Sequence, residues 1–270
     1  MTYSEIVSIV RERNRPSGGI KTVHEVVVNA VIKPVHKVLE IGSNTGFTSV
    51  NIGLLAGSNV IGIDVIDESL KEAKKYAKEN NVDDKVSFIK ANALNLPFED
   101  GYFDFVWASN VTSFIDDKNK AINEYLRVLK IGGILVVIPI YYFSNPPKSI
   151  VNEISRAIGS KIQVWDKKYW LNRIENAAVS THYGLELIYE SSYRYDDKEN
   201  DIENYVTEIF NKKHLLCLPE KERSELKNNY RNFIRLFNEN LKYAQYSILL
   251  FQKRRQKDEM ELFTTNKIVL

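Results

Sequence analysis

The chain's best candidate ligand site is a glycine turn at residues 40–46, with the sequence Glu-Ile-Gly-Ser-Asn-Thr-Gly. It joins an apolar run to an amphipathic segment, a layout that aims free backbone N–H groups and a helix N-terminus at a ligand. A dinucleotide-binding turn needs a second glycine where this chain has Asn44, because the backbone there approaches a pyrophosphate. The carboxylate of Glu40 would repel a phosphate but could hold an amino group. The turn therefore argues against a pyrophosphate ligand.

A second apolar run, Val60–Asp64, ends in an acid about twenty residues after the turn. An α/β fold places a carboxylate there to bind ribose hydroxyls, and a short rigid carboxylate can accept two hydrogen bonds at once. A solvated strand end is the alternative interpretation of Asp64. Because the glycine turn precedes it, we expect Asp64 to bind a ribose.

These residues need a sheet to position them, and the chain alternates apolar runs with amphipathic segments. The predicted strands span residues 38–41, 60–64, 86–90, 103–107 and 134–138, and the intervening helices span 47–56, 68–80 and 118–130. Asp67 is the expected N-cap of the second helix, and Gly132 and Gly133 are expected to end the third. Strands that alternate with helices predict a parallel sheet covered on both faces.

The order E-x-G-x-N-x-G, followed by an acid at the end of the next run, resembles the S-adenosylmethionine site of class I methyltransferases. The similarity covers residues 38–137. It includes Leu96–Asp104, which resembles the family's L-P-F-D-F-D approach to the fourth strand, and Leu129–Gly133, which matches L-K-P-G-G with Ile131 in place of proline. The resemblance implies an α/β fold with a doubly wound, mostly parallel seven-stranded sheet and an antiparallel last strand. It also implies N-terminal helices and a helical cap inserted between the last two strands.

The resemblance assigns the methionyl part of the cofactor to the glycine turn. Gly42 and Gly46 would form the turn beside it, with Asn44 on the same turn, and the carboxylate of Glu40 and the nearby backbone would address its amino group. Asp64 would accept both ribose hydroxyls.

On the adenine side, the resemblance implies that Val65 packs on the ring. Asn92 and Ala93 follow the third strand, where the family usually carries an acid that accepts from the adenine amino group. The amide oxygen of Asn92 can accept the same hydrogen bond. A plain turn residue is the alternative interpretation of Asn92.

On the acceptor side, Ser109 is a candidate cofactor contact, and Asn110, Tyr141 and Tyr142 are candidate substrate contacts. The alternatives are a loop that satisfies its own backbone and aromatic packing under the cap. Many small-molecule members carry a histidine near Ser113, but this chain has none there, so the catalytic residue stays unknown. If a general base is used, the candidates are His182, His214 and a tyrosine of the cap, and the sequence does not choose among them. The chain's histidines form no metal-like pair, and no metal site is expected.

The chain of 270 residues fits one elaborated domain. We expect residues 1–36 to be N-terminal helices of that domain with a potential lid role, and residues 254–270 to be a tail. Residues 37–253 are the expected methyltransferase domain, with a helical cap around 198–242. The oligomeric state is left open.

Composition and charge give no indication of a nucleic-acid partner, a disulfide framework or a membrane span. A net charge of +2 and a pI of about 8.4 are too mild to imply a nucleic-acid partner. A single cysteine, Cys217, excludes an intramolecular disulfide and agrees with a cytoplasmic location. The longest apolar stretch, residues 133–143, is too short to span a membrane.

The predicted activity is methyl transfer from S-adenosylmethionine to an O, N or C atom of a small or medium organic acceptor. Because the cofactor brings the activation, the protein mainly positions the reactants and excludes water, and no nucleophile is required. The aromatic residues of the expected cap favour a partly apolar acceptor. The alternatives are an RNA or protein methyltransferase and a non-catalytic relative that binds the cofactor. Asn44 and Glu40 disfavour a nicotinamide oxidoreductase.

Overall fold

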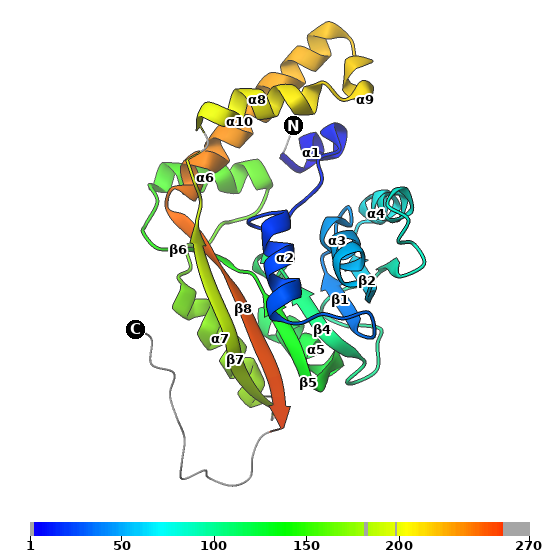
Figure 1. Cartoon of the computed structure of the whole chain (residues 1–270). Coiled ribbons are helices and arrows are strands. Elements are labelled where there is room, and N and C mark those ends of the chain that lie inside the picture. The colour runs from blue at the N-terminus through cyan, green and yellow to red at the C-terminus, as the bar shows by residue number, and fades with distance from the viewer. Residues whose placement is uncertain (1–2, 181–182, 198, 256–270) are drawn as a thin grey trace.

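One eight-stranded sheet organises the computed structural model, which describes residues 3–180, 183–197 and 199–255 (Figure 1). The strands are β1 (Lys37–Ile41), β2 (Asn59–Asp64), β3 (Val86–Lys90), β4 (Phe103–Ala108), β5 (Leu129–Val137), β6 (Ile140–Tyr142), β7 (Tyr183–Arg194) and β8 (Ala244–Arg255). Their order is β3-β2-β1-β4-β5-β8, with β6 and β7 also paired to β8. The first five strands run parallel, and β8 runs antiparallel to β5, β6 and β7. The expected fold class is confirmed, and the short β6 is an additional strand.

Helices cover both faces of the sheet. They are α1 (Tyr3–Val10), α2 (Ile20–Asn29), α3 (Phe47–Ala56), α4 (Asp67–Glu79), the 3-10 helix η1 (Asn110–Phe114), α5 (Lys118–Val128), α6 (Lys148–Ile158), α7 (Lys167–Ser180), α8 (Glu199–Phe210), α9 (Lys213–Leu216) and α10 (Glu220–Leu241). Val38 packs with α2, α3 and α4, whereas Leu39 packs with α5 and α7, because successive strand side chains point to opposite faces. Among the described residues, no helix has the length and apolarity to cross a membrane.

The cap has its own hydrophobic core. Helices α8, α9 and α10 lie between β7 and β8, and Ile202, Phe210 and Tyr230 are buried among them. Helix α1 packs into this cluster through Ile6 and Val10. Figure 1 shows α1, α8 and α10 together, at the end of the sheet where β5 leads into β6. The two N-terminal helices therefore separate, α1 packing on the cap and α2 on α3 and the sheet.

Two local predictions were wrong. Helix α5 ends at Val128, and β5 begins at once, so the glycine pair does not cap a helix. It lies instead in the irregular start of β5, where a Cβ on Gly133 would be 2.9 Å from the carbonyl oxygen of Asp104 on β4. Asp67 is the first residue of α4 rather than its cap, and its carboxylate binds Lys90.

Of the predicted tail, residues 254 and 255 belong to β8, and the others lie outside the described residues.

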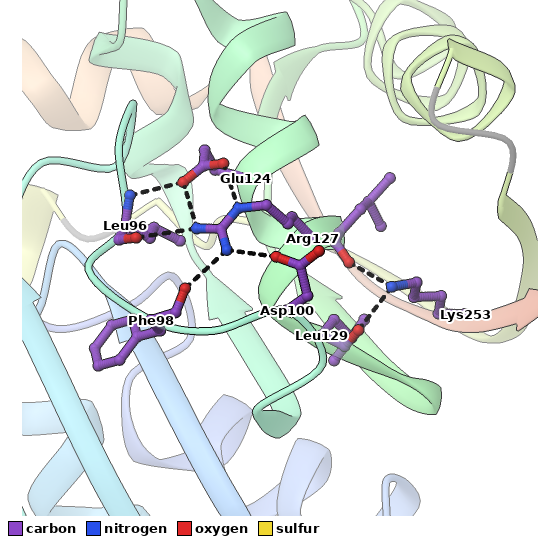
Figure 2. Close-up of polar contacts among 8 residues, drawn as sticks. Leu96, Phe98, Asp100, Glu124, Arg127, Leu129 and Lys253 are labelled. Atoms are coloured by element: carbon purple, nitrogen blue, oxygen red, sulfur yellow. Dashed lines mark hydrogen bonds and ion pairs between the residues drawn. The ribbon is translucent and has the colours of Figure 1, made fainter.

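The loop between β3 and β4 is held by one arginine (Figure 2). The guanidinium of Arg127 on α5 donates to the carbonyl oxygens of Leu96 and Phe98, at 3.0 and 2.7 Å, and to the carboxylates of Glu124 and Asp100. Glu124 in turn accepts from the backbone N–H of Leu96 at 2.7 Å. These contacts fix the loop that begins with the predicted adenine-binding residues.

Candidate functional site

Two glycines shape the turn at the carboxyl end of β1. Gly42 has φ 69°, and a Cβ there would lie 2.5 Å from a side-chain methyl of Val111. Gly46 has φ 83°, and a Cβ there would lie 2.8 Å from the ring of Phe88. Both residues occupy the left-handed region that glycine alone adopts freely, and both are closely packed. The turn therefore requires glycine at these two positions for its shape and for its packing.

The turn is joined directly to the acid at the end of β2. The backbone N–H of Asn44 donates to Oδ2 of Asp64 at 2.9 Å, and that of Ile66 donates to Oδ1 at 3.0 Å. Asn44 has φ 44°, and its side-chain oxygen accepts from the N–H of Thr45 at 2.7 Å. Two backbone groups thus orient the half-exposed carboxylate of Asp64, and each of its oxygens can accept a further hydrogen bond.

An apolar pair follows this carboxylate. Val65 is 58% exposed and Ile66 is 52% exposed, although both are large and apolar. An exposed apolar surface beside a carboxylate suits a flat ring attached to a polyol. Ile66 was not predicted as a site residue, although its apolar side chain directly after Val65 could have indicated it.

Glu40 supports the first turn of α3. Its side chain is only 5% exposed, and Oε2 accepts from the backbone N–H of Ser49 at 2.9 Å and from the Ser49 hydroxyl. Burial raises the pKa of Glu40 to about 7. The hydrogen bonds from Ser49 and Thr48 lower this pKa, and the charge of Asp64 raises it by a smaller amount. The contact of Glu40 with Ser49 satisfies a backbone N–H in the first turn of α3, which has no partner within the helix. Its contact with a cofactor amino group stays a prediction.

On the adenine side, the structure shows Asn92 as a turn residue. Its Oδ1 accepts from the N–H of Leu94 at 2.9 Å, and its carbonyl oxygen accepts from the N–H of Asn95 at 3.0 Å. One lone pair of Oδ1 remains for a ligand. The preceding residue, Ala91, donates its N–H to the carbonyl oxygen of Asp64, and this contact brings the ends of β2 and β3 together. Ala93 is half-buried against the core on the α5 side.

Hydrogen bonds join the residues that follow β4 to each other, to β4 and to β6. The hydroxyl of Ser109 accepts from Nε1 of Trp107 at 2.8 Å. Oδ1 of Asn110 accepts from the hydroxyl of Ser113 at 2.7 Å and from the N–H of Ile140 at 3.3 Å. Asn110 therefore joins η1 to β6, so it has a structural role whether or not it contacts a substrate.

The two tyrosines of β6 differ. Tyr141 is 1% exposed, and its hydroxyl shares a hydrogen bond with that of Ser247 at 2.6 Å. Tyr142 is half-buried, donates to Oδ1 of Asn240 on α10 at 3.1 Å, and borders a surface hollow of about 440 Å³ together with Trp165. The structure places Tyr141 in the interior and Tyr142 beside open space.

No histidine among the described residues forms a hydrogen bond with the turn. His36 precedes β1, at the end of this strand opposite the turn, and Nε2 of His214 lies 3.1 Å from the carbonyl oxygen of Ile9 in α1. His24 is exposed on α2. His182, a further candidate base, lies outside the described residues.

The chain is similar in sequence to a known protein family and to several known proteins. Residues 39–137 match the family model described as a methyltransferase domain. An uncharacterized protein of Haemophilus influenzae is 31% identical over 170 residues, which are 62% of this chain and 67% of that protein. The ubiquinone/menaquinone biosynthesis C-methyltransferase UbiE of Proteus mirabilis is 31% identical over 165 residues, 60% of this chain and 61% of that enzyme. The alignment thus spans less than two thirds of the Proteus enzyme's length.

A solved structure shows the same fold. The crystal structure of the MccD protein aligns with a TM-score of 0.73 and 22% identity, covering 89% of this chain and 100% of that one. At this identity the similarity shows the shared architecture.

Proposed function

We infer the reaction of this protein from one premise: the chain belongs to the class I S-adenosylmethionine-dependent methyltransferases. Its cofactor is S-adenosylmethionine. We infer that the protein transfers the methyl group to an O, N or C atom of a small or medium organic molecule. The observation that carries this inference is the contact between Asn44 and Asp64, which joins a glycine turn to an oriented carboxylate.

The residues present fit this cofactor. Asp64 offers two carboxylate oxygens to the ribose hydroxyls, and the exposed Val65 and Ile66 offer an apolar surface to the adenine. In the turn, the hydroxyls of Ser43 and Thr45 are buried and have no hydrogen-bond partner among the described residues. We propose that the turn binds the methionyl end, with Glu40 nearest to its amino group.

Bound S-adenosylmethionine supplies a methyl group activated by its sulfonium. The residues of the chain then act by position and by exclusion of water, because an in-line transfer gains most from correct placement in a dry site. Gly42, Asn44 and Gly46 fix the backbone of the turn, and Asp64 fixes the ribose side. No nucleophilic residue is required.

The acceptor is proposed to lie at the end of the sheet where β4 and β5 lead into η1 and β6. Phe114 in η1 is 61% exposed and Phe143 after β6 is 42% exposed, so apolar surface is available on that side. The cap's aromatic residues argue less for an apolar acceptor than expected, because Phe210 and Tyr230 are buried in the cap's own core. The Proteus relative, whose name places it in quinone biosynthesis, supports a small organic acceptor. We assign α1, together with α8, α9 and α10, to the cap.

We further propose a cytoplasmic location and no nucleic-acid partner. Cys217 is an exposed free thiol, which suits a reducing compartment. The net charge of +2 gives no strong attraction for a phosphate backbone.

Two measurements test the proposed function. Titration calorimetry with S-adenosylhomocysteine is expected to show binding, and failure to bind at sub-millimolar concentration would overturn the cofactor assignment. Radiolabelled S-adenosylmethionine is then offered with a panel of phenols, quinols and amines, and in parallel with bulk RNA and unfolded protein. Label in a small acceptor supports the proposal, and label only in RNA or protein contradicts it. Binding without any transfer would identify a non-catalytic relative.

A further inference from the structure

The link between α1 and α2 crosses from the cap to the sheet. At its start, the carboxylate of Glu12 accepts from the hydroxyls of Tyr230, at 2.7 Å, and of Tyr205, both on cap helices. At its end, the hydroxyl of Ser17 shares a hydrogen bond with that of Tyr195, just after β7, at 2.6 Å. The segment between these anchors is short and passes beside α3.

Arg15 lies in the middle of this link. Its guanidinium carbon is 5.3 Å from the ring centroid of Phe47, the first residue of α3 and the neighbour of Gly46 in the glycine turn. The charge of Arg15 also acts on the cap, because it opposes the rise in the pKa of Tyr205 on α8 to about 12 that burial causes. The guanidinium therefore lies beside the first residue of α3, next to the glycine turn, and is exposed.

Arg15 has no carboxylate partner among the residues that the structure describes. The nearby Arg13 differs, because it stacks on Tyr76 at 3.5 Å and pairs with Glu79 at 3.7 Å. Lys212, the basic residue of the cap nearest the link, donates to the carbonyl oxygens of Val10 and Arg11. An exposed arginine without an acid, beside a ligand-binding turn, is available to an anionic group of the ligand.

The methionyl end of S-adenosylmethionine carries one carboxylate as well as one amino group. With Glu40 on the amino side, the carboxylate needs a donor from outside the turn, and the planar fork of a guanidinium matches a carboxylate with two parallel hydrogen bonds. We propose that Arg15 binds the methionyl carboxylate of the cofactor. This inference rests on the assignment of the glycine turn to S-adenosylmethionine. It gives the link between α1 and α2 a role in selecting a cofactor that carries the methionyl carboxylate.

The test compares two ligands that differ only in the carboxylate. S-adenosylhomocysteine and its decarboxylated analogue, S-adenosyl-3-thiopropylamine, are titrated into the wild type, Arg15→Ala and Arg15→Lys. Arg15→Ala is expected to weaken binding of S-adenosylhomocysteine by about 10- to 100-fold, the loss typical of a charge-assisted hydrogen bond. Binding of the decarboxylated analogue is expected to stay unchanged, and Arg15→Lys is expected to recover part of the loss.

Arg13→Ala is the matched control, because Arg13 lies on the same link but already has partners. It is expected to leave the ratio between the two ligands unchanged. If Arg15→Ala weakens both ligands equally, or neither, the inference is wrong while the cofactor assignment stands. Failure of the wild type to bind S-adenosylhomocysteine would instead overturn the proposed function.

Discussion

The backbone N–H of Asn44 lies 2.9 Å from Oδ2 of Asp64, although the two residues are 20 positions apart. Strands β1 and β2 are parallel neighbours, with Ile41 opposite Ile63, so the residues after each strand emerge at the same edge of the sheet. Open α/β sheets generally bind their ligands at this edge. The hydrogen bond therefore joins the turn and the acid into one unit.

Asp64 is expected to dominate the binding of the ribose. Asp64→Ala should weaken S-adenosylhomocysteine binding by about 100-fold, because two hydrogen bonds to a charged group are lost. Asp67→Ala is the matched control, since this acid is three residues away and pairs with Lys90 on the surface. Calorimetry on both variants checks the prediction, and equal losses in the two would contradict the assignment of Asp64.

The packing at Gly46 can be separated from its backbone strain. Gly46 and Gly132 have almost the same φ, 83° and 82°, but a Cβ at Gly132 would meet nothing within 4 Å, whereas one at Gly46 would meet Phe88 and Ala73. Gly132→Ala should cost about 1 kcal/mol from strain alone. Gly46→Ala should cost a further ~1–3 kcal/mol from overpacking. Urea unfolding of both variants measures the difference, and similar losses would show that α3 and α4 shift to make room.

The buried carboxyl of Glu40 should make stability depend on pH. Its pKa is raised from 4.5 to about 7, so the folded state holds the proton more tightly than the unfolded state. The resulting stabilisation is fully present below pH 4.5 and is lost as the pH rises through 7. Between pH 5 and pH 8 the loss should be about 2 kcal/mol.

Urea unfolding of the ligand-free protein at pH 5 and pH 8 measures this loss, with Glu40→Gln as the comparison. The amide does not titrate, so the fall in stability between the two pH values should be smaller in the variant by that amount. The same fall in both proteins would place the titration on other groups.

Local patterns predicted the part of the fold that forms the candidate cofactor site. The apolar runs placed β1 and β2, and the glycine turn and the acid lie together because parallel strands end at one edge. The same reasoning failed at Gly132 and Gly133, because a glycine pair after a helix is equally compatible with a tight approach between strands.

The sequence holds no local pattern that predicts which distant segments contact each other. Helix α1 is amphipathic, and its periodicity shows which face is buried but not against what. The hydrogen bond from Tyr230 to Glu12 spans 218 positions, and it is among the contacts that attach α1 to the cap. The exposed position of Arg15 beside Phe47 depends on this long-range packing, so the sequence could not indicate it.

Arg127 is expected to stabilise the loop between β3 and β4 far more than a surface arginine would. Arg127→Ala removes the guanidinium that donates to the carbonyl oxygens of Leu96 and Phe98 and to the carboxylate of Glu124. Because the carboxylate and the carbonyl of Leu96 are partly buried, the loss should be about 2–4 kcal/mol. Arg127→Lys should recover only part of it, since an ammonium cannot reproduce the fork of contacts.

The matched control is Arg254→Ala. Arg254 also binds a carboxylate through two nitrogens, because its Nε and Nη2 both donate to Glu186. Both of these side chains are more than half exposed. Its loss should cost less than about 1 kcal/mol, because solvent screens the pair. Urea unfolding of both variants gives the comparison. Hydrogen exchange at the amide of Leu96 then distinguishes a local effect from a global one, because this N–H donates to Glu124 and should exchange faster only in the Arg127 variants. Equal losses in the two alanine variants would show that the loop is held by its own apolar contacts instead.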